Sequence, residues 1–238
     1  MTRAWKDTWF ESGVNTKGAG LWRGVEAQHV IATLKLTDTR EEHEVLESLL
    51  EGSKPPLPPG VEQQHFLVFT PFRYRSPIAS RFRRATDPGV WYGGEDLRTA
   101  CAEVAYWKWR FLTESDGLRG RTLFTEHTFF QARARGRCAD LTAAPWKAAA
   151  RAWTQKDDYS ACQDLAEAAR PQNVAWIRYG SVRLSGGICG AVLAAEALSL
   201  PRGFEQQTWD CRTAQAGVYL QRRIERSQHF EFAAQSFE

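Results

Sequence analysis

The pattern of hydrophobic and polar residues divides the chain at a proline-rich stretch, Gly-Ser-Lys-Pro-Pro-Leu-Pro-Pro-Gly, at residues 52–60. Neither a helix nor a central strand accepts this many prolines, so the stretch predicts a stiff connector. Before it, the apolar run Val30–Leu36 predicts a strand, and residues 38–50 place four aliphatic residues on one helical face. We therefore expect a small N-terminal annex and connector over residues 1–60, docked on a main domain over residues 61–238.

The first half of the main domain combines two predicted strands with a long predicted helix. Phe66–Phe69 is a candidate buried strand, and Val90–Tyr92 is a second strand that ends at two glycines. Asp96 then opens a helix as its N-cap, because apolar residues follow with a period of 3.6. The apolar positions of this helix are Leu97, Ala100, Cys101, Val104, Trp107 and Phe111. Glu103 lies on the flank of that stripe, where a carboxylate can point into a cleft beside the core.

The second half predicts further strands around one more helix. Residues Leu123–Phe130 alternate weakly, as a strand does, and Val174–Tyr179 and Ile188–Leu193 are apolar strand candidates. Between them, Ser160 and Gln163 have the spacing of a capping box, so we expect a helix capped by Ser160. Strands and helices in this order predict an α+β domain with a mixed or split β-sheet core and flanking helices.

Composition is that of an ordinary globular protein and argues against several classes. Hydrophobic residues make up 43% and charged residues 25%, and the net charge of +3 gives no strong push towards nucleic acid or membranes. No apolar run approaches the roughly 20 residues of a membrane-spanning helix, and the first residues lack the apolar stretch of a signal peptide. We therefore expect a cytoplasmic protein. The five cysteines and five histidines are scattered, which predicts neither a disulfide framework nor a metal site.

A basic cluster follows the first strand candidate. Its arginines are Arg73, Arg75, Arg81, Arg83 and Arg84. Taken alone, such a cluster is equally typical of surface ion pairs and of a nucleic-acid patch. An enzyme that cleaves RNA would also need a general acid and base, usually including histidine, and the histidines lie far from this stretch in sequence.

Several blocks, in the right order, resemble the two halves of a RES domain. The first half is matched by Phe72-Arg73-Tyr74, Val90–Gly93 and Thr99–Val104. The second half is matched by Asp158–Gln163, Ile177–Arg183 and Gly186-Gly187. The similarity runs from about Phe66 to the region of Leu198. One block departs from the family pattern, because Ser80-Arg-Phe-Arg83 stands where the family has Gly-Arg-Trp-Asn.

The resemblance implies a fold, an activity and a partner. RES proteins are the toxins of RES–Xre toxin–antitoxin modules, their fold is similar to that of ADP-ribosyltransferase toxins, and they act on NAD⁺. The resemblance therefore implies that this chain cleaves the nicotinamide–ribose bond of NAD⁺, its substrate, without a metal. The implied partner is an Xre-like helix-turn-helix antitoxin that blocks the active site. No membrane partner and no direct contact with nucleic acid are expected.

Carried over residue by residue, the resemblance also implies a site. The expected catalytic residues are Arg73, Tyr92, Glu103 and Ser160. The expected contacts to NAD⁺ are Arg73, Tyr74, Arg81, Tyr92 and Ser160.

These residue types suit the chemistry. Breaking the nicotinamide–ribose bond builds positive charge on the ribose, which the carboxylate of Glu103 can stabilise. Arg73 can fork two hydrogen bonds to a pyrophosphate or to the ribose. Tyr92 suits an aromatic wall for nicotinamide, and Ser160, at a helix N-terminus, would lie where a phosphate or a ribose hydroxyl binds.

The acceptor of the ADP-ribosyl group stays open at this point. Transfer to water or phosphate would deplete NAD⁺, and this is the leading expectation. Transfer to a protein target would instead make the chain a mono-ADP-ribosyltransferase, and the annex is extra surface that could recognise such a target. A further alternative, from the basic cluster and the 10 tryptophans, is a toxin that binds or cleaves RNA.

Overall fold

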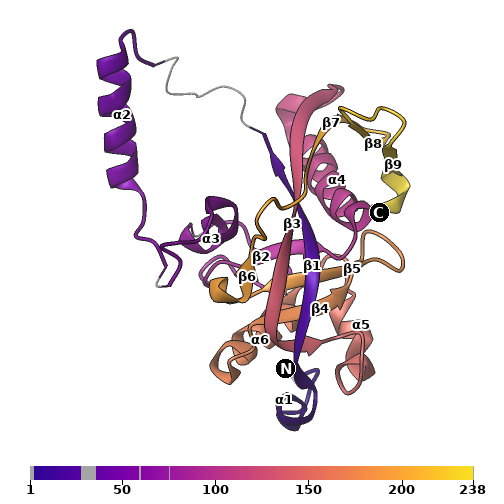
Figure 1. Ribbon diagram of the computed structural model, residues 1–238. Helices are drawn as coiled ribbons and strands as arrows, with labels where there is room; N and C mark the ends of the chain where they lie inside the picture. The colour runs from indigo at the N-terminus through magenta and orange to yellow at the C-terminus, as the bar shows by residue number, and fades with distance from the viewer. Residues whose placement is uncertain (1–2, 28–35, 59, 75, 238) are drawn as a thin grey trace.

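The computed structural model describes residues 3–27, 36–58, 60–74 and 76–237 (Figure 1). The helices are α1 (Thr8–Ser12), α2 (Arg40–Ser53), α3 (Phe66–Arg73), α4 (Leu97–Glu114), α5 (Ala150–Trp153) and α6 (Ser160–Ala169). The strands are β1 (Val14–Glu26), β2 (Trp91–Gly94), β3 (Leu123–Asp140), β4 (Trp176–Gly180), β5 (Ile188–Val192), β6 (Leu198–Ser199), β7 (Gln206–Ala214), β8 (Gly217–Arg222) and β9 (His229–Ala233). The strand predicted at Val30–Leu36 lies outside the described residues, except for Leu36.

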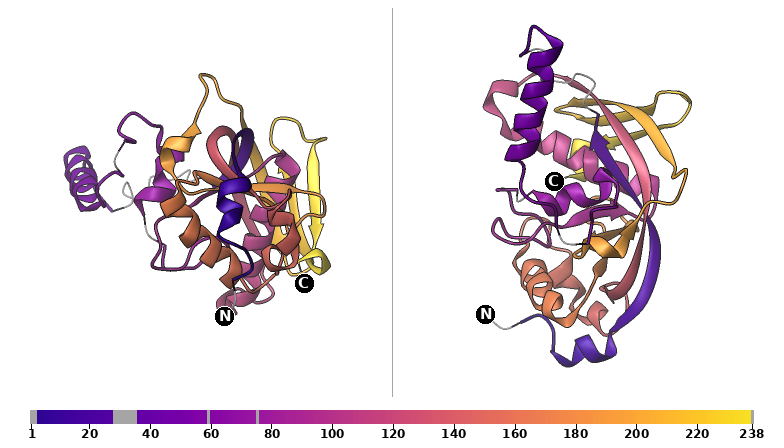
Figure 2. Two further views of the ribbon diagram at one scale, coloured as in Figure 1. Left: turned by 90° about the horizontal axis from the view of Figure 1, so that it is seen from below. Right: turned by 60° about the vertical axis from the view of Figure 1, so that its left-hand side comes forward.

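One mixed sheet organises the described residues, with strands in the order β1-β2-β5-β4-β3-β7-β8-β9 and β6 beside β3. The long strands β1 and β3 run side by side, and every residue of β1 has a partner in β3 (Figure 2). Because β1 also pairs with β2, the strands β1, β2, β5, β4 and β3 form a closed ring of pairings. The β3–β4 pairing is parallel, whereas β2–β5 and β4–β5 are antiparallel. A mixed sheet with flanking helices confirms the predicted α+β class.

The two faces of this ring have different roles, because successive side chains of a strand point to opposite faces. Across the ring, Trp91, Val192, Trp176 and Cys138 occupy one row of paired residues. All four are buried in the same apolar cluster. Helix α3 packs on this face through Val68, whereas α4 packs against β1, β2, β7 and β8 on the other face.

Helix α4 begins where the sequence predicted. Asp96 is its N-cap, and the carboxylate accepts hydrogen bonds from Thr99 N at 2.8 Å and from Thr99 Oγ1 at 2.6 Å. The start of the helix lies close to the sheet because Gly94 has no side chain. A Cβ at this position would lie 2.7 Å from Ala100 N. The cap and the glycine together fix where α4 leaves the sheet.

The predicted apolar stripe of α4 is only partly buried. Trp107 and Phe111 are 41% and 56% exposed, whereas Cys101, Ala105 and Leu112 are buried. The buried face of α4 is therefore rotated about the helix axis relative to the predicted apolar stripe. Periodicity identifies an apolar helix face, but it does not distinguish a core contact from the wall of an open cleft.

Residues Phe66–Phe69 are helical, so the buried strand predicted there is wrong. They form the first turn of α3, and Nδ1 of His65 caps the helix by accepting a hydrogen bond from Leu67 N. A run of four apolar residues is too short to distinguish a period of 2 from a period of 3.6. Only Val68 of this helix is buried, which also differs from the expectation of a fully buried strand.

The other strand predictions agree with the structure in place and type. The predicted strands at 174–179 and 188–193 are β4 and β5, and the one at 123–130 is the first part of the longer β3. The two glycines expected to end the strand after Tyr92 instead belong to β2, where both pair with β5.

The capping box predicted at the start of α6 is wrong, although the helix itself is confirmed. Tyr159 occupies the N-cap position and makes no capping hydrogen bond with its side chain, and Ser160 is the first helical residue. The carboxylate of Asp158 accepts a hydrogen bond from Ser160 N at 2.9 Å. Gln163 does not reach back to the cap, because its side-chain amide donates to the carbonyl of Ser80 at 3.0 Å.

The described segments before residue 60 differ in how they contact the rest of the chain. β1 lies inside the sheet, and Phe10 of α1 packs edge-on against Trp146 with ring centroids 5.1 Å apart. The predicted helix at 38–50 is α2, which begins with a complete capping box but has no buried residue and stands away from the sheet (Figure 1). A domain boundary near residue 60 stays a prediction, and β1 is part of the main sheet.

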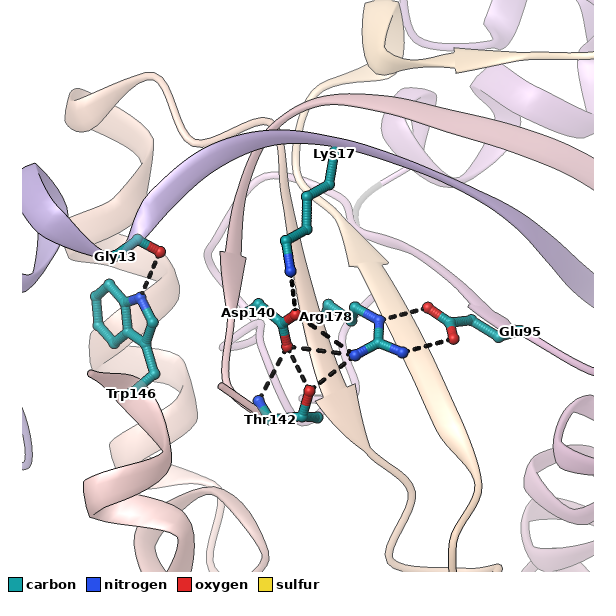
Figure 3. A network of polar contacts seen from close by, with 7 residues as sticks. All are labelled: Gly13, Lys17, Glu95, Asp140, Thr142, Trp146 and Arg178. Carbon is teal, nitrogen blue, oxygen red and sulfur yellow. Dashed lines mark hydrogen bonds and ion pairs between the residues drawn. The ribbon is translucent and has the colours of Figure 1, made fainter. Parts of the chain in front are cut away.

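A polar network ties β4 to the loop before α4 (Figure 3). Arg178 of β4 donates two hydrogen bonds to Glu95, from Nε at 2.6 Å and from Nη2 at 2.8 Å. This bidentate arrangement is the strongest geometry for an arginine–carboxylate pair. Because Glu95 immediately precedes the N-cap residue Asp96, the ion pair holds the start of α4 and thereby places Glu103.

The same network continues to β1 and β3 through Asp140. Its carboxylate accepts hydrogen bonds from Lys17 Nζ at 2.5 Å and from Thr142 Oγ1 at 2.6 Å, and Arg178 Nη1 lies 3.4 Å from Oδ2 (Figure 3). Burial by itself would raise the pKa of Asp140, but these donors outweigh it and the pKa is lowered. These ion pairs and hydrogen bonds thus hold the parallel strands β3 and β4 together.

Candidate active site

A cleft of about 670 Å³ opens between α4 and the side of the strand ring that faces it. One row of paired residues forms its floor, namely Trp22 of β1, Gly94 of β2, Cys189 of β5 and Tyr179 of β4. One face of α4 forms a wall through Ala100, Glu103, Val104, Trp107, Lys108 and Phe111. The spacing of three and four residues keeps these side chains on a single helical face.

Glu103 lies in the inner part of the cleft, with one carboxylate oxygen held by its neighbours. Oε1 accepts a hydrogen bond from Ser181 Oγ at 2.7 Å, and the Cys189 sulfur lies 3.6 Å from the same atom. Ser181 Oγ in turn accepts hydrogen bonds from the backbone N–H groups of Arg183 and Leu184, both at 3.1 Å. The serine therefore orients the carboxylate. Among the described residues Oε2 has no hydrogen-bond partner, so it is the oxygen that can meet a ligand.

Two buried arginines line the same cleft. Arg81 and Arg183 are 7% and 5% exposed. Arg81 Nη1 donates to the carbonyl oxygens of residues 153 and 155, at 3.2 and 2.9 Å. Arg183 Nη2 donates to the carbonyl of Lys156 at 2.9 Å and to the hydroxyl of Tyr159 at 3.1 Å. In the part of the chain that the structure describes, neither guanidinium forms an ion pair with a carboxylate.

Aromatic rings fix both guanidinium groups. The Cζ atom of Arg81 lies 4.5 Å from the ring centroid of Tyr159, and that of Arg183 lies 3.4 Å from the ring centroid of Tyr106. Burial by itself would lower the pKa of Arg81, but neighbouring groups, from Tyr179 to Glu103, leave its pKa above the ordinary value. The inner cleft is therefore a rigid, positively charged pocket around one carboxylate.

Tyr92 lies on the β2 side of this pocket. Its hydroxyl forms a 2.8 Å hydrogen bond with Ser80 Oγ and accepts one from Phe82 N at 3.0 Å. Burial raises the pKa of Tyr92 to about 12, so the phenol stays neutral at physiological pH. Tyr92 therefore shapes the wall and positions the loop at residues 80–82, and it is not a base.

Arg23 of β1 also lines the cleft. Its Nη1 donates to the carbonyl oxygen of Tyr92 at 3.0 Å, and its Cζ lies 5.3 Å from the ring centroid of Trp91. Burial lowers the pKa of Arg23 to about 10, which still leaves the group charged at neutral pH. Arg23 therefore ties β1 to β2, and its guanidinium lies against Trp91, which belongs to the apolar cluster on the opposite face of the ring.

Comparison with known families identifies the family of this chain. Residues 58–214 match the family model of the RES domain. The chain belongs to the RES domain family. A chain of the M. tuberculosis MbcT–MbcA toxin–antitoxin complex is similar to this RES protein at 13% identity, over 96% of this chain and 92% of that chain, with a TM-score of 0.48. The search of curated proteins gave no match. Among the described helices of the RES protein, none is long and apolar enough to cross a membrane.

The structure of this RES protein brings three of the predicted site residues together. Glu103, Tyr92 and Arg81 all line the cleft. Arg81 comes from the block Ser80–Arg83, which departs from the family pattern, yet its guanidinium lies in the same pocket as Glu103. The changed residues around Arg81 in this block therefore do not move its side chain out of the pocket.

Arg73 and Tyr74 lie elsewhere, at the end of α3. Arg73 Nε donates to the carbonyl of Pro55 at 2.6 Å, and Nη1 forms an ion pair with Glu51 of α2 at 3.4 Å. Neither Arg73 nor Tyr74 lines the cleft. In this structure Arg73 therefore holds the connector against α3, whereas Arg81 lies in the cleft with Glu103.

Ser160 is likewise outside the cleft, exposed at the start of α6. The serine that contacts Glu103 is Ser181, and the arginine beside it is Arg183. The signal for both was in the sequence, because the block Ile177–Arg183 belongs to the same resemblance. Ser181 follows a predicted strand, and only the folded structure shows that it reaches Glu103.

Proposed function

We propose that this RES protein is the toxin of a type II toxin–antitoxin module, and that it cleaves the nicotinamide–ribose bond of NAD⁺ in the cytoplasm. The observation that carries the proposal is the inner cleft. Arg81 and Arg183 are buried and face the same cleft as Glu103, without a carboxylate partner among the described residues. Buried charges require a counter-charge, and the pyrophosphate of a dinucleotide supplies one.

The remaining geometry suits the bond-breaking step. As the bond between ribose C1′ and the nicotinamide nitrogen breaks, its electron pair leaves with nicotinamide and positive charge develops on the ribose. Glu103 Oε2 would lie against that charge, while Ser181 holds Oε1 at 2.7 Å. Water or phosphate then adds to C1′ and loses a proton, which gives ADP-ribose or its phosphate ester. The neutral hydroxyl of Tyr92 and the ring itself would line the nicotinamide side.

An antitoxin is part of the proposal because a free NAD⁺-consuming enzyme would harm its own cell. The RES family membership supports an Xre-like partner with a helix-turn-helix domain. We expect this partner to occupy the cleft and cover Glu103. Trp107 and Phe111, exposed on α4 at the cleft, give such a partner an apolar contact.

The test is incubation of the purified full chain with NAD⁺, with free nicotinamide and adenine-containing products separated by chromatography. We expect nicotinamide to be released, with ADP-ribose as product in water and its phosphate ester when inorganic phosphate is added. Transfer of labelled ADP-ribose to a cellular protein would identify the chain as a mono-ADP-ribosyltransferase instead. Absence of nicotinamide release with every acceptor would overturn the proposal, and RNA cleavage that persists in Glu103→Gln would favour the RNA alternative.

A further inference from the structure

The cleft continues beyond Glu103 towards the C-terminal half of α4. Trp107 and Phe111 line this outer part, and Phe111 lies about 12 Å along the helix axis from Glu103. The opposite wall is formed by the end of β1 and by His127 of β3, which is paired with Glu26 across the two strands. The outer part is therefore far enough from Glu103 to hold a different group of the same ligand.

Charge distinguishes the two parts of the cleft. The inner part contains Arg81 and Arg183, which have no carboxylate partner among the described residues. The charged residues of the outer part, Lys108 and Glu26, form an ion pair with each other. The outer part therefore presents no net charge. A neutral end beside a cationic centre fits a ligand in which phosphates are joined to an uncharged ring.

His127 brings one polar group to the outer part. The residue is 3% exposed, and its Nε2 lies 3.1 Å from Thr125 Oγ1. Its Nδ1 has no hydrogen-bond partner within the described chain. Burial lowers the pKa of His127 to about 4, so the ring is neutral near pH 7 and Nδ1 can make one hydrogen bond, as donor or acceptor. A buried polar atom without a partner is uncommon in proteins, and a ligand can provide the missing partner.

Two aromatic rings face the outer part from α4. Trp107 is held in place, because Tyr106 meets it edge-on at 5.3 Å and Arg110 Cζ lies 5.6 Å from its ring centroid. Phe111 is 56% exposed and stacks on no other aromatic ring among the described residues. Exposed aromatic rings beside a cationic centre suit the stacking of nucleobases.

We propose that this outer part is a subsite for a purine base, in which the base packs against Phe111 and Trp107 and its edge bonds to His127 Nδ1. The subsite rests on the proposed function to the extent that the base is the adenine of NAD⁺. It assigns the two halves of the dinucleotide to opposite ends of the cleft, with nicotinamide riboside at Glu103 and adenosine at Phe111.

A binding experiment tests the subsite without any turnover. Calorimetry with the full chain compares AMP with ribose 5-phosphate, which carries the phosphate but lacks the base. We expect AMP to bind at least ten-fold more tightly. Phe111→Ala should weaken AMP binding about ten-fold, as the loss of one base-stacking contact does, and leave ribose 5-phosphate unchanged. The matched control is Phe124→Ala, since Phe124 is 75% exposed on β3 but lies outside the cleft.

Equal affinities of the wild-type chain for AMP and ribose 5-phosphate would overturn the subsite, and so would normal AMP binding by Phe111→Ala. A turnover experiment adds a second readout. His127→Phe keeps an aromatic ring but removes Nδ1, so the ratio of kcat/KM for NAD⁺ over nicotinamide mononucleotide should fall about ten-fold. If this variant does not fold, Phe111→Ala serves for the same ratio.

The two experiments separate failure of the subsite from failure of the proposed function. AMP binding that depends on Phe111, without release of nicotinamide from NAD⁺, would keep the subsite and reject the enzyme. Release of nicotinamide with an unchanged ratio in both variants would keep the enzyme and reject the subsite.

Discussion

Arg178 in the sheet and the two buried arginines of the cleft have opposite surroundings. Arg178 is partly exposed, with 24% of its side chain open to solvent, and it is matched by the carboxylates of Glu95 and Asp140. Arg81 and Arg183 are more deeply buried, at 7% and 5% exposure, yet their guanidinium groups bond to carbonyl oxygens and a phenol, pack on aromatic rings and form no ion pair with a carboxylate among the described residues. The more deeply buried arginines are therefore the ones whose charge is not matched by a carboxylate ion pair in the described part of the chain.

This difference separates residues that hold the fold from residues that are expected to hold a ligand. Removal of a paired arginine such as Arg178 destabilises the fold, because its carboxylate partners lose that counter-charge. A buried guanidinium without a carboxylate contributes little to stability, and its position is explained by an anionic ligand. Substitutions in the two sets should therefore have opposite effects on stability and activity.

The largest stability effect is expected at Arg178. Arg178→Met leaves Asp140 with Lys17 as its only cationic partner among the described residues and Glu95 without its bidentate partner. We expect the free energy of unfolding to fall by about 3 to 4 kcal/mol, as measured by urea unfolding. The control Arg119→Met removes an exposed surface pair with Asp116 and should cost less than about 0.5 kcal/mol. Equal losses in the two variants would contradict the structural role of the network.

A second expected effect is a loss of stability in acid that depends on His127. Its pKa is about 4 in the folded chain and about 6.5 when unfolded, so the unfolded chain binds a proton first as the pH falls. The free energy of unfolding should therefore drop below pH 6.5, by about 3 kcal/mol in total when pH 4 is reached. Urea unfolding of His127→Phe at pH 7 and pH 4.5 should show a much smaller drop than the wild-type chain. Parallel pH profiles would mean that His127 is not neutral and buried in the folded protein.

Substitution of Arg183 should have a small effect on stability and a large effect on activity, the reverse of substitution of Arg178. Arg183→Gln removes an uncompensated charge, so the free energy of unfolding should change by less than about 1 kcal/mol. Release of nicotinamide from NAD⁺ should nevertheless fall about 100-fold in kcat/KM, because a fixed donor to the pyrophosphate is lost. Kinetics and urea unfolding on the same preparation check both statements. A variant that loses stability but keeps activity would assign Arg183 to the fold.

The elements that sequence predicts best are those with a local physical signature. Helix α4 has a side-chain cap at Asp96 and a long apolar period, and it lies where predicted. The run Phe66–Phe69 has no such signature, and its conversion into α3 depends on the cap at His65 and on contacts made elsewhere. Short apolar runs are decided by tertiary packing, which the sequence pattern does not encode locally.

The site divides in the same way. Glu103 and Tyr92 were predicted because their blocks resemble the family over several ordered residues. Ser181 and Arg183 were missed as central residues because a serine after a strand and two nearby glycines are ordinary turn chemistry. The contact of Ser181 with Glu103 spans 78 residues of sequence and exists only once the sheet and α4 have packed together.

The central claim is that Glu103 stabilises the charge that develops when NAD⁺ is cleaved. The most direct measurement is nicotinamide release by the wild-type chain, by Glu103→Gln and by Glu114→Gln, whose carboxylate lies on the same helix but outside the cleft. We predict a loss of about 1,000-fold in kcat for Glu103→Gln, with normal urea unfolding, and wild-type activity for Glu114→Gln. Full activity of a folded Glu103→Gln protein would contradict the account.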